Sequence, residues 1–252
     1  MMFSDMQQIQ DTLQVHNVCE QQRKECLGEL YIKRIQKRIL TKNYITLFLG
    51  ETGSGKSWAS LRLAEQLDPN FTHDNVIYTQ KDFHEKIQNA KPYSAFVYEE
   101  VGVNMASHDF WKNITTNAIL QTFRHQHLIL IMNCPVIDFI SRQAVKLIHS
   151  SYLIKSMNKQ GMFSTARALH LQTDGQFNFT KQASPIIQLK DGEKIMVESI
   201  KIKAPSLKLR RDYERASEEY KIGLKEEMRK KAEVKEAIRS AELRKKFAKI
   251  ET

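Results

Sequence analysis

The stretch that decides the fold reads YITLFLGETGSGKS and spans residues 44–57. Its first six residues are mostly apolar, which is typical of a strand buried on both faces. The remaining eight satisfy the pattern G-x-x-x-x-G-K-[ST], and a helical pattern follows over residues 56–67. A glycine-rich loop between a strand and a helix turns its N–H groups inward, toward a phosphate. The segment therefore predicts a phosphate-binding loop.

Each side chain of this loop has a physical task. Lys56 would neutralise oxygens of the β- and γ-phosphates, and the hydroxyl of Ser57 would bind Mg²⁺. A nucleotide with Mg²⁺ is therefore the expected cofactor. The residues expected to contact the nucleotide are Gly50, Glu51, Thr52, Gly53, Ser54, Gly55, Lys56, Ser57 and Trp58.

Outside this loop, short apolar runs alternate with helical patterns, which is typical of a mostly parallel sheet with crossover helices. We expect strands at residues 44–49, 75–79, 95–99, 128–133 and 152–155, and helices at 56–67, 81–89, 110–125 and 137–149. After residue 156 the pattern has a period of two, with turn signals at residues 159–161, 173–175 and 190–192. The predicted fold class is α/β, a three-layer P-loop NTPase with a mostly parallel central sheet extended by antiparallel strands, plus helical N- and C-terminal appendages.

The expected organisation has three regions: an N-terminal helical appendage (1–40), the P-loop core (41–204) and a charged C-terminal helical tail (205–252). In the first region, apolar residues from Leu27 to Ile39 repeat at helical spacing, with basic residues on the other faces. We favour packing of this stripe on the core over binding to a membrane. In the third region, pairs such as Glu227 and Lys231 have the i, i+4 spacing that stabilises a long helix.

Two acids follow the expected strand in AFVYEE, residues 95–100. Glu99 would lie near Ser57 and the metal, and Glu100 would polarise the attacking water. An aspartate usually holds the first of these places, but a glutamate can still hold Mg²⁺ through a bound water. Mg²⁺ is thus expected between Ser57 and Glu99, with Glu100 as the catalytic base.

Two further side chains are candidates for catalysis. Asn133 ends an apolar run and could sense the γ-phosphate or orient water, although an Asn before Cys-Pro is also a common turn former. Arg124 ends an expected helix and could act as a trans finger on a neighbouring subunit's nucleotide. Its alternative role is a helix C-terminal cation that interacts with the helix dipole.

The sequence favours ATP over GTP. Guanine is usually selected by an N-K-x-D segment, and the nearest match, NKQG at residues 158–161, lacks the acid. A small-molecule kinase would need an arginine-rich lid and no water-activating base beside the metal. Hydrolysis of ATP is therefore the expected reaction.

Composition favours a polyanionic partner. The chain of 252 residues has a formal charge of +10, and clustered Lys and Arg release counterions when they meet phosphates. Charge alone leaves DNA, RNA and acidic lipid open. Three cysteines without paired spacing favour reduced thiols over a disulfide framework or a zinc site. With no signal pattern and no long apolar run, a cytoplasmic location is expected.

Taken together, these motifs resemble the additional-strand, catalytic-glutamate branch of P-loop ATPases, and within it the FtsK/HerA-like group. The run from Glu99 to Gly102, the aromatic pair Phe110-Trp111, the segment QTFRH at 121–125 and Pro135 are similar to Zot-type ATPases of filamentous phages and of archaeal plasmids and viruses. The resemblance covers about residues 30–155. It implies a homo-oligomer, such as a hexameric ring, that works on DNA with nucleotide held between subunits.

The expected function is an ATP hydrolase that couples Mg-ATP turnover to DNA translocation, packaging or export in a viral or plasmid context. The alternative is a nucleotide-gated DNA-binding or assembly scaffold with slow hydrolysis. Membrane association, through a partner or through the basic N-terminal helix, stays open. Stimulation of hydrolysis by DNA would separate the motor from the scaffold.

Overall fold

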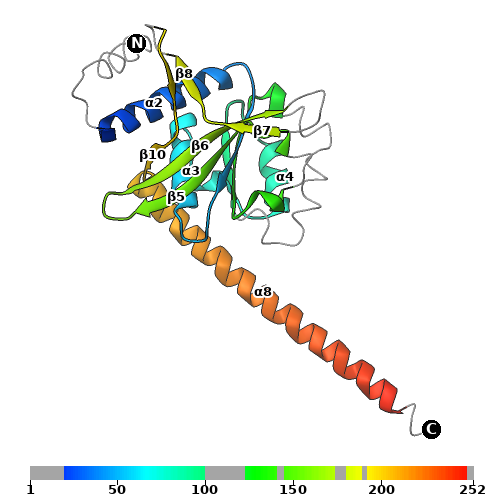
Figure 1. Cartoon of the computed structure of the whole chain (residues 1–252). Coiled ribbons are helices and arrows are strands. Elements are labelled where there is room, and N and C mark those ends of the chain that lie inside the picture. The colour runs from blue at the N-terminus through cyan, green and yellow to red at the C-terminus, as the bar shows by residue number, and fades with distance from the viewer. Residues whose placement is uncertain (1–19, 100–122, 141–144, 174–179, 189–191, 249–252) are drawn as a thin grey trace. The chain divides into compact units, whose positions relative to one another are not determined.

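The computed structural model describes residues 20–99, 123–140, 145–173, 180–188 and 192–248 (Figure 1). The chain divides into two compact units, Met1–Leu209 and Arg210–Thr252. The first unit is built on an eight-stranded sheet, and the second consists of the greater part of one long helix. Within the described residues, no helix combines the length and apolar character that a membrane crossing requires.

The main sheet has the strand order β10-β6-β5-β1-β4-β3-β2, with β7 also paired to β6. Five neighbouring strands are parallel, and the three strands that follow them in sequence join the sheet antiparallel. Their bounds are β1 (Tyr44–Leu49), β2 (Val76–Ile77), β3 (Ala95–Tyr98), β4 (Ile129–Cys134), β5 (Ser150–Asn158), β6 (Phe163–Thr173), β7 (Thr180–Ala183) and β10 (Ile200–Lys203). The predicted α/β fold with a mostly parallel, antiparallel-extended sheet is confirmed.

Strand β1 lies inside the sheet and is covered on both faces. Alternate side chains of a strand point to opposite sides, so Phe48 faces one layer and Leu47 the other, and both have no exposed surface. On the first side, Phe48 stacks on Tyr152 of β5, and Tyr31 of helix α2 (Glu20–Ile39) meets the same ring edge-on. On the second side, Leu47 joins a core cluster with Phe83 of helix α4 (Gln80–Gln88). The sheet is therefore the middle of three layers.

Helix α2 packs as its apolar stripe predicts. Leu30, Tyr31, Ile35 and Ile39 are each at most 5% exposed. Arg34, on another face of the helix, is exposed and donates from Nη1 to the carbonyl of Ile186 at 2.7 Å. The helix therefore covers the sheet with its apolar side and keeps basic side chains outside.

The remaining helices connect or extend the strands. Helix α3 (Lys56–Leu67) follows the glycine-rich loop, and α4 begins with a capping box in which Thr79 and Asp82 each accept from the other's backbone N–H. A small separate sheet pairs β8 (Ile186–Gln188) with β9 (Lys194–Met196). Short 3-10 turns cover His73–Asn75 and Ile137–Phe139.

The helix expected over 137–149 is described only in part. The described residues show the 3-10 turn Ile137–Phe139, a bend at Ile140, a helical residue at Val145, a turn at 146–147 and no regular structure at 148–149, while residues 141–144 lie outside the described residues. His149 lies beside β1, since its N–H donates to Ile45 O at 2.9 Å and its Nδ1 accepts from Ile45 N at 3.0 Å. The expected helix is therefore wrong at its two ends, and at the C-terminal end these hydrogen bonds to β1 replace the helical ones. The expected helix 110–125 is described only over 123–125, which is helical.

The second unit is described as a continuation of helix α8 (Leu207–Ala248). The expected long helix is confirmed. The pair of Glu227 and Lys231 lies 2.5 Å apart, and Arg229 and Glu233 form a similar i, i+4 pair at 3.2 Å. These exposed pairs support the helix by local charge, with little apolar surface from the helix itself.

Candidate nucleotide site

Two glycines of the loop after β1 combine a positive φ with close neighbours. Gly55, which precedes α3, has φ 95°, and a Cβ there would lie 2.8 Å from Ser164 Oγ and 3.0 Å from Met157 Sδ. Gly50, at φ 147°, would bring a Cβ within 3.1 Å of the carbonyl of Ile154. Positive φ and close neighbours both exclude larger residues. The loop is thus held against the β5–β6 hairpin at its first and last glycine.

The side chain of Lys56 bonds to the backbone at the start of the loop. Its Nζ donates to the carbonyl of Gly50 at 2.7 Å and to that of Glu51 at 2.8 Å. The ammonium group is therefore held at the loop, where it can neutralise phosphate oxygens bound by the backbone N–H groups and by the N-terminus of α3.

A polar cluster lies directly beside this loop. Ser57 Oγ donates to Glu99 Oε2 at 3.2 Å, and Asn133 Nδ2 donates to Glu99 Oε1 and to Ser60 Oγ, both at 2.9 Å. Glu99 and Asn133 are 6% and 1% exposed, so this carboxylate is buried and held by polar partners. The sequence predicted Ser57, Glu99 and Asn133 as site residues, and the structure brings them together.

Strand order explains why these residues meet. Parallel strands end at the same edge of a sheet, and β1, β4 and β3 are neighbours in that order. The loop continues from β1, Asn133 lies near the end of β4, and Glu99 directly follows β3. Residues separated by dozens of positions in the chain therefore converge at one edge.

The oxygen atoms of Ser57 and Glu99 fit a magnesium ion. Hydroxyl and carboxylate oxygens are the hard ligands that Mg²⁺ prefers, and it keeps several waters beside such protein ligands. The pair lies at the N-terminus of α3, next to Lys56. These two residues would hold the ion, and the ion would supply charge neutralisation for the nucleotide phosphates.

The other residues predicted to contact the nucleotide differ in how exposed they are. Glu51, Thr52 and Gly53 form the exposed tip of the loop, while Trp58 is half-buried in the first turn of α3. Glu100 lies outside the described residues. Ser54 Oγ is buried, and none of the described residues provides it with a hydrogen-bond partner.

Arg124 is not brought to the loop of its own chain. It is exposed in the helical residues 123–125, just before β4, and Leu128 N donates to Phe123 O across that turn. It therefore lies at the edge where the parallel strands begin, whereas the loop follows the edge where they end. Its predicted role as a trans finger stays a prediction.

No family model matches the chain, and no curated protein matches it. Among solved structures, the chain is similar to the N-terminal domain of zonular occludens toxin from Neisseria meningitidis, with 14% identity, coverage of 57% of this chain and 94% of that one, and a TM-score of 0.29. It is also similar to a DNA polymerase III gamma subunit-related protein from Thermotoga maritima, with 11% identity, coverage of 51% and 47%, and a TM-score of 0.37. At such low TM-scores, neither likeness carries information on the function of this chain.

Three neighbours of the site were not predicted from the sequence. Ser60, one turn after Ser57 on α3, accepts from Asn133, and its small polar side chain on an otherwise apolar face was the available signal. Met157 and Ser164 lie so close to Gly55 that a Cβ there would clash with them. No sequence pattern indicates this closeness, because it depends on how β5 and β6 pair.

Cys134, which follows Asn133, is a buried thiol beside the site. Burial raises its pKa to about 11, the largest effect, while the hydrogen bond to Val136 O at 2.9 Å and the charge of Lys56 lower it. The thiol therefore stays protonated near neutral pH and is a poor nucleophile.

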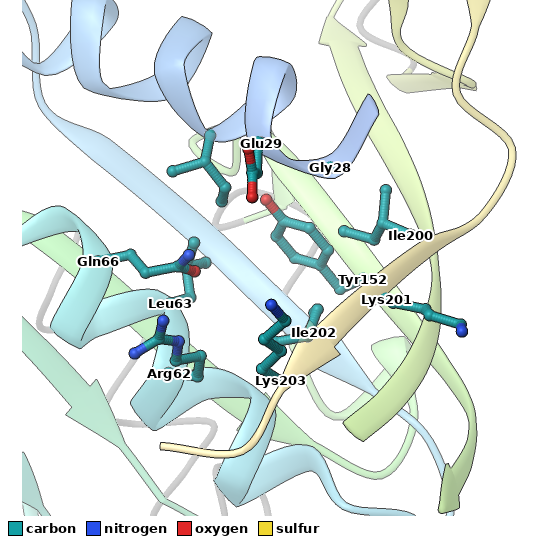
Figure 2. Close-up of a pocket in the computed structure, with 11 residues that line it drawn as sticks. Gly28, Glu29, Arg62, Leu63, Gln66, Tyr152, Ile200, Lys201, Ile202 and Lys203 are labelled. Atoms are coloured by element: carbon teal, nitrogen blue, oxygen red, sulfur yellow. The ribbon is translucent and has the colours of Figure 1, made fainter. Parts of the chain in front are cut away.

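A small pocket of about 90 Å³ lies apart from the phosphate loop (Figure 2). It is formed between α2, α3 and β10, with the ring of Tyr152 at its base, and none of its lining residues belongs to residues 50–57. The side chain of Arg62 on its wall pairs with Glu65 at 2.8 Å. The pocket is therefore a gap between helices and the edge strand, and the nucleotide site is the open loop at the other end of α3.

Proposed function

We propose that this protein is an Mg²⁺-dependent ATP hydrolase that couples turnover to movement of DNA. The observation that carries the proposal is the buried carboxylate of Glu99, held 3.2 Å from Ser57 Oγ and 2.9 Å from Asn133 Nδ2 beside the lysine of the phosphate loop. A carboxylate next to the loop serine is what a metal-assisted attack of water on a phosphate requires. An ordinary glycine-rich turn would have no reason to bury one.

The residues divide the chemistry among themselves. Lys56 and the loop N–H groups bind the phosphates, and Ser57 with Glu99 hold the metal. Asn133 orients the Glu99 carboxylate, so in this geometry it is a positioning residue. Its Oδ1 is buried without a hydrogen-bond partner among the described residues, which leaves an acceptor for water or phosphate. Glu100, next in the chain, is the proposed base that polarises the attacking water.

The strand order supports assignment to the additional-strand class of P-loop ATPases. Strand β4 lies between β1, which carries the loop, and β3, which carries the acids. The resemblance to FtsK/HerA-like and Zot-type proteins then suggests DNA translocation, packaging or export, in a viral or plasmid context. A charge of +10 supports DNA as the partner. We also propose a homo-oligomer, because Arg124 is exposed and lies away from its own chain's loop.

The decisive test is phosphate release by the purified full chain, with Mg-ATP and with or without single-stranded or duplex DNA. We expect hydrolysis that DNA stimulates. Glu100→Gln should still bind ATP but lower turnover by about 100-fold or more, since the attacking water loses its base. Normal turnover in that variant would remove Glu100 from the mechanism. Hydrolysis that DNA does not change, with assembly induced by a non-hydrolysable analogue, would instead support the scaffold function.

A further inference from the structure

Strands β5, β6 and β10 share a sheet face that no helix of the described chain fills. In the antiparallel register, Leu153 pairs with Arg167 and Thr165 pairs with Lys201, and paired residues point to the same side. Leu153 is 40% exposed and Arg167 is exposed, while Thr165 and Lys201 are half-buried. We call these four residues, together with Phe163, the outer face.

The opposite side of the same strands is buried. Ile154, Ala166 and Ile200, which alternate with outer-face residues, are 4%, 0% and 2% exposed. Helix α2 packs there against β10, and the contact is visible beside Tyr152 (Figure 2). The outer face is therefore the more exposed side of these strands. The corresponding side of the parallel strands is covered by a helical layer.

Every formal charge on this part of the sheet is positive. Residues 150–173 include Lys155, Lys159 and Arg167 and contain no Asp or Glu, and β10 adds Lys201 and Lys203. Lys155 is exposed at the irregularity between Ile154 and Ser156, where the strand register shifts. Such a bulge re-aims a side chain and breaks regular pairing. A stretch with only positive formal charges attracts a polyanionic partner, in a chain that elsewhere mixes both signs.

The chemistry of the outer face fits a nucleic-acid backbone better than an acidic lipid surface. Lys201 Nζ lies 4.5 Å from the centre of the Phe163 ring, so a cation and an aromatic plane lie together between flanking Lys and Arg residues. Cations along a groove or face neutralise successive phosphates, and aromatic planes stack on bases. Insertion into lipid would need a broader apolar surface than Leu153 and Phe163 offer on this face.

The same hairpin touches the phosphate loop. A Cβ on Gly55 would meet Met157 of β5 and Ser164 of β6, and a Cβ on Gly50 would meet the carbonyl of Ile154. Ser164 alternates with Phe163 and Thr165 of the outer face along one strand. A displacement of the hairpin would therefore move residues that contact the phosphate loop, namely Ile154, Met157 and Ser164.

We propose that the outer face binds the phosphate backbone of DNA and that its hairpin transmits DNA binding to the phosphate loop. This inference rests on the proposed function, since it names the surface through which DNA would alter ATP hydrolysis. Linkage requires the effect to be reciprocal, so a bound nucleotide should change DNA affinity by the factor by which DNA changes nucleotide affinity.

The test compares the outer-face double variant Arg167→Ala/Lys201→Ala with the control Lys81→Ala/Lys91→Ala, in the full chain. Both remove two positive charges, but Lys81 and Lys91 are exposed on α4 and in the loop before β3. Fluorescence anisotropy with a labelled single strand and its duplex, over a range of salt concentrations, gives affinity and salt dependence. We expect the outer-face variant to lose DNA affinity by about tenfold or more, and the slope of log K against log[salt] to fall by about 0.7–0.9 for each lost phosphate contact.

Phosphate release separates this inference from the proposed function. The outer-face variant should keep basal ATP hydrolysis and lose its stimulation by DNA, whereas the control should keep both. Equal loss of DNA affinity in the two double variants would reduce the effect to net charge and overturn the proposed surface. Failure of the unmodified chain to bind DNA would overturn it as well. Absence of hydrolysis with DNA binding lost only in the outer-face variant would refute the ATPase while leaving the surface in place.

Discussion

The two halves of the main sheet differ in what covers them. The parallel strands from β2 to β1 have helices or turns on both faces, and the central side chains Leu47 and Phe48 are fully buried. In the antiparallel half, β6 and β10 are covered on one face only. On their other face, Arg167 is exposed and Lys201 is half-buried. A strand buried on both faces can place a few polar groups with precision, as at Glu99. A strand with one open face can change its surface without disturbing the core.

The largest effect should be on stability, from truncating one apolar side chain that is buried and one that is exposed. Phe48→Ala removes a ring that is fully buried and stacked on Tyr152 at 4.6 Å, and should cost about 3–5 kcal/mol of unfolding free energy. Leu153→Ala, on the outer face, should change it by less than about 0.5 kcal/mol. Urea denaturation of both variants measures the difference. Similar losses in the two would mean that the outer face is also packed.

The next effect concerns activity alone. Lys56→Ala removes the ammonium group that bonds Gly50 O and Glu51 O, and should weaken ATP binding and lower kcat/KM by about 100-fold or more. Lys91→Ala, an exposed lysine before β3, is the matched control and should leave phosphate release unchanged. An ATP titration by calorimetry checks binding directly. Retained affinity in the Lys56 variant would argue against its role at the phosphates.

A smaller change should follow from loosening the buried carboxylate. Asn133→Ala removes the amide donor to Glu99 Oε1 at 2.9 Å, so the metal ligand should be less well oriented. We expect the Mg²⁺ concentration for half-maximal phosphate release to rise about tenfold, with a smaller change in the KM for ATP. A purely structural role for Asn133 would lower stability without moving the Mg²⁺ dependence. Asn89→Ala, on an exposed helix end, provides the control.

The smallest expected effect is a pH dependence of stability from His149. Burial, followed by the charge of Arg38, lowers the pKa of this imidazole to about 4. Its usual pKa is near 6.5, so the unfolded chain takes up the proton first as pH falls. The stability that the neutral imidazole contributes to the folded state is therefore fully present above about pH 6.5. It is lost as the pH falls from about 6.5 to about 4.

The measurement is urea unfolding at about pH 7 and pH 5. The original chain should lose about 1–2 kcal/mol more than His149→Asn, whose side-chain oxygen can still accept from Ile45 N. The same comparison with His73→Asn, a histidine outside the sheet, controls for general acid effects. An identical pH response in the His149 variant and the original chain would show that this imidazole is not the group responsible.

The local sequence pattern predicted an element correctly where a single segment contains all the residues that define it. The strand over residues 44–49 and the helix over 56–67 appear with the predicted bounds, because a continuous apolar run and a glycine-rich start are local features. Strand 75–79 shortened to Val76–Ile77, since Asn75 closes a capping turn with Thr72. The helix predicted over 137–149 does not extend to His149, because hydrogen bonds to Ile45 of β1, a distant partner, compete with the local preference there.

The sequence by itself determined the phosphate loop, the acids after the next strand and the antiparallel extension, since glycine, lysine and alternation act through neighbours in the chain. Only the tertiary structure decided that β4 lies between the loop and the acids, that Ser57 and Asn133 hold the carboxylate, and that Arg124 lies at the opposite edge. It also decided that the hairpin lies against Gly55 and that the charged side chains of its outer face are positive. Those relations depend on the order and register of strands, which long-range hydrogen bonds and packing select and no single segment encodes.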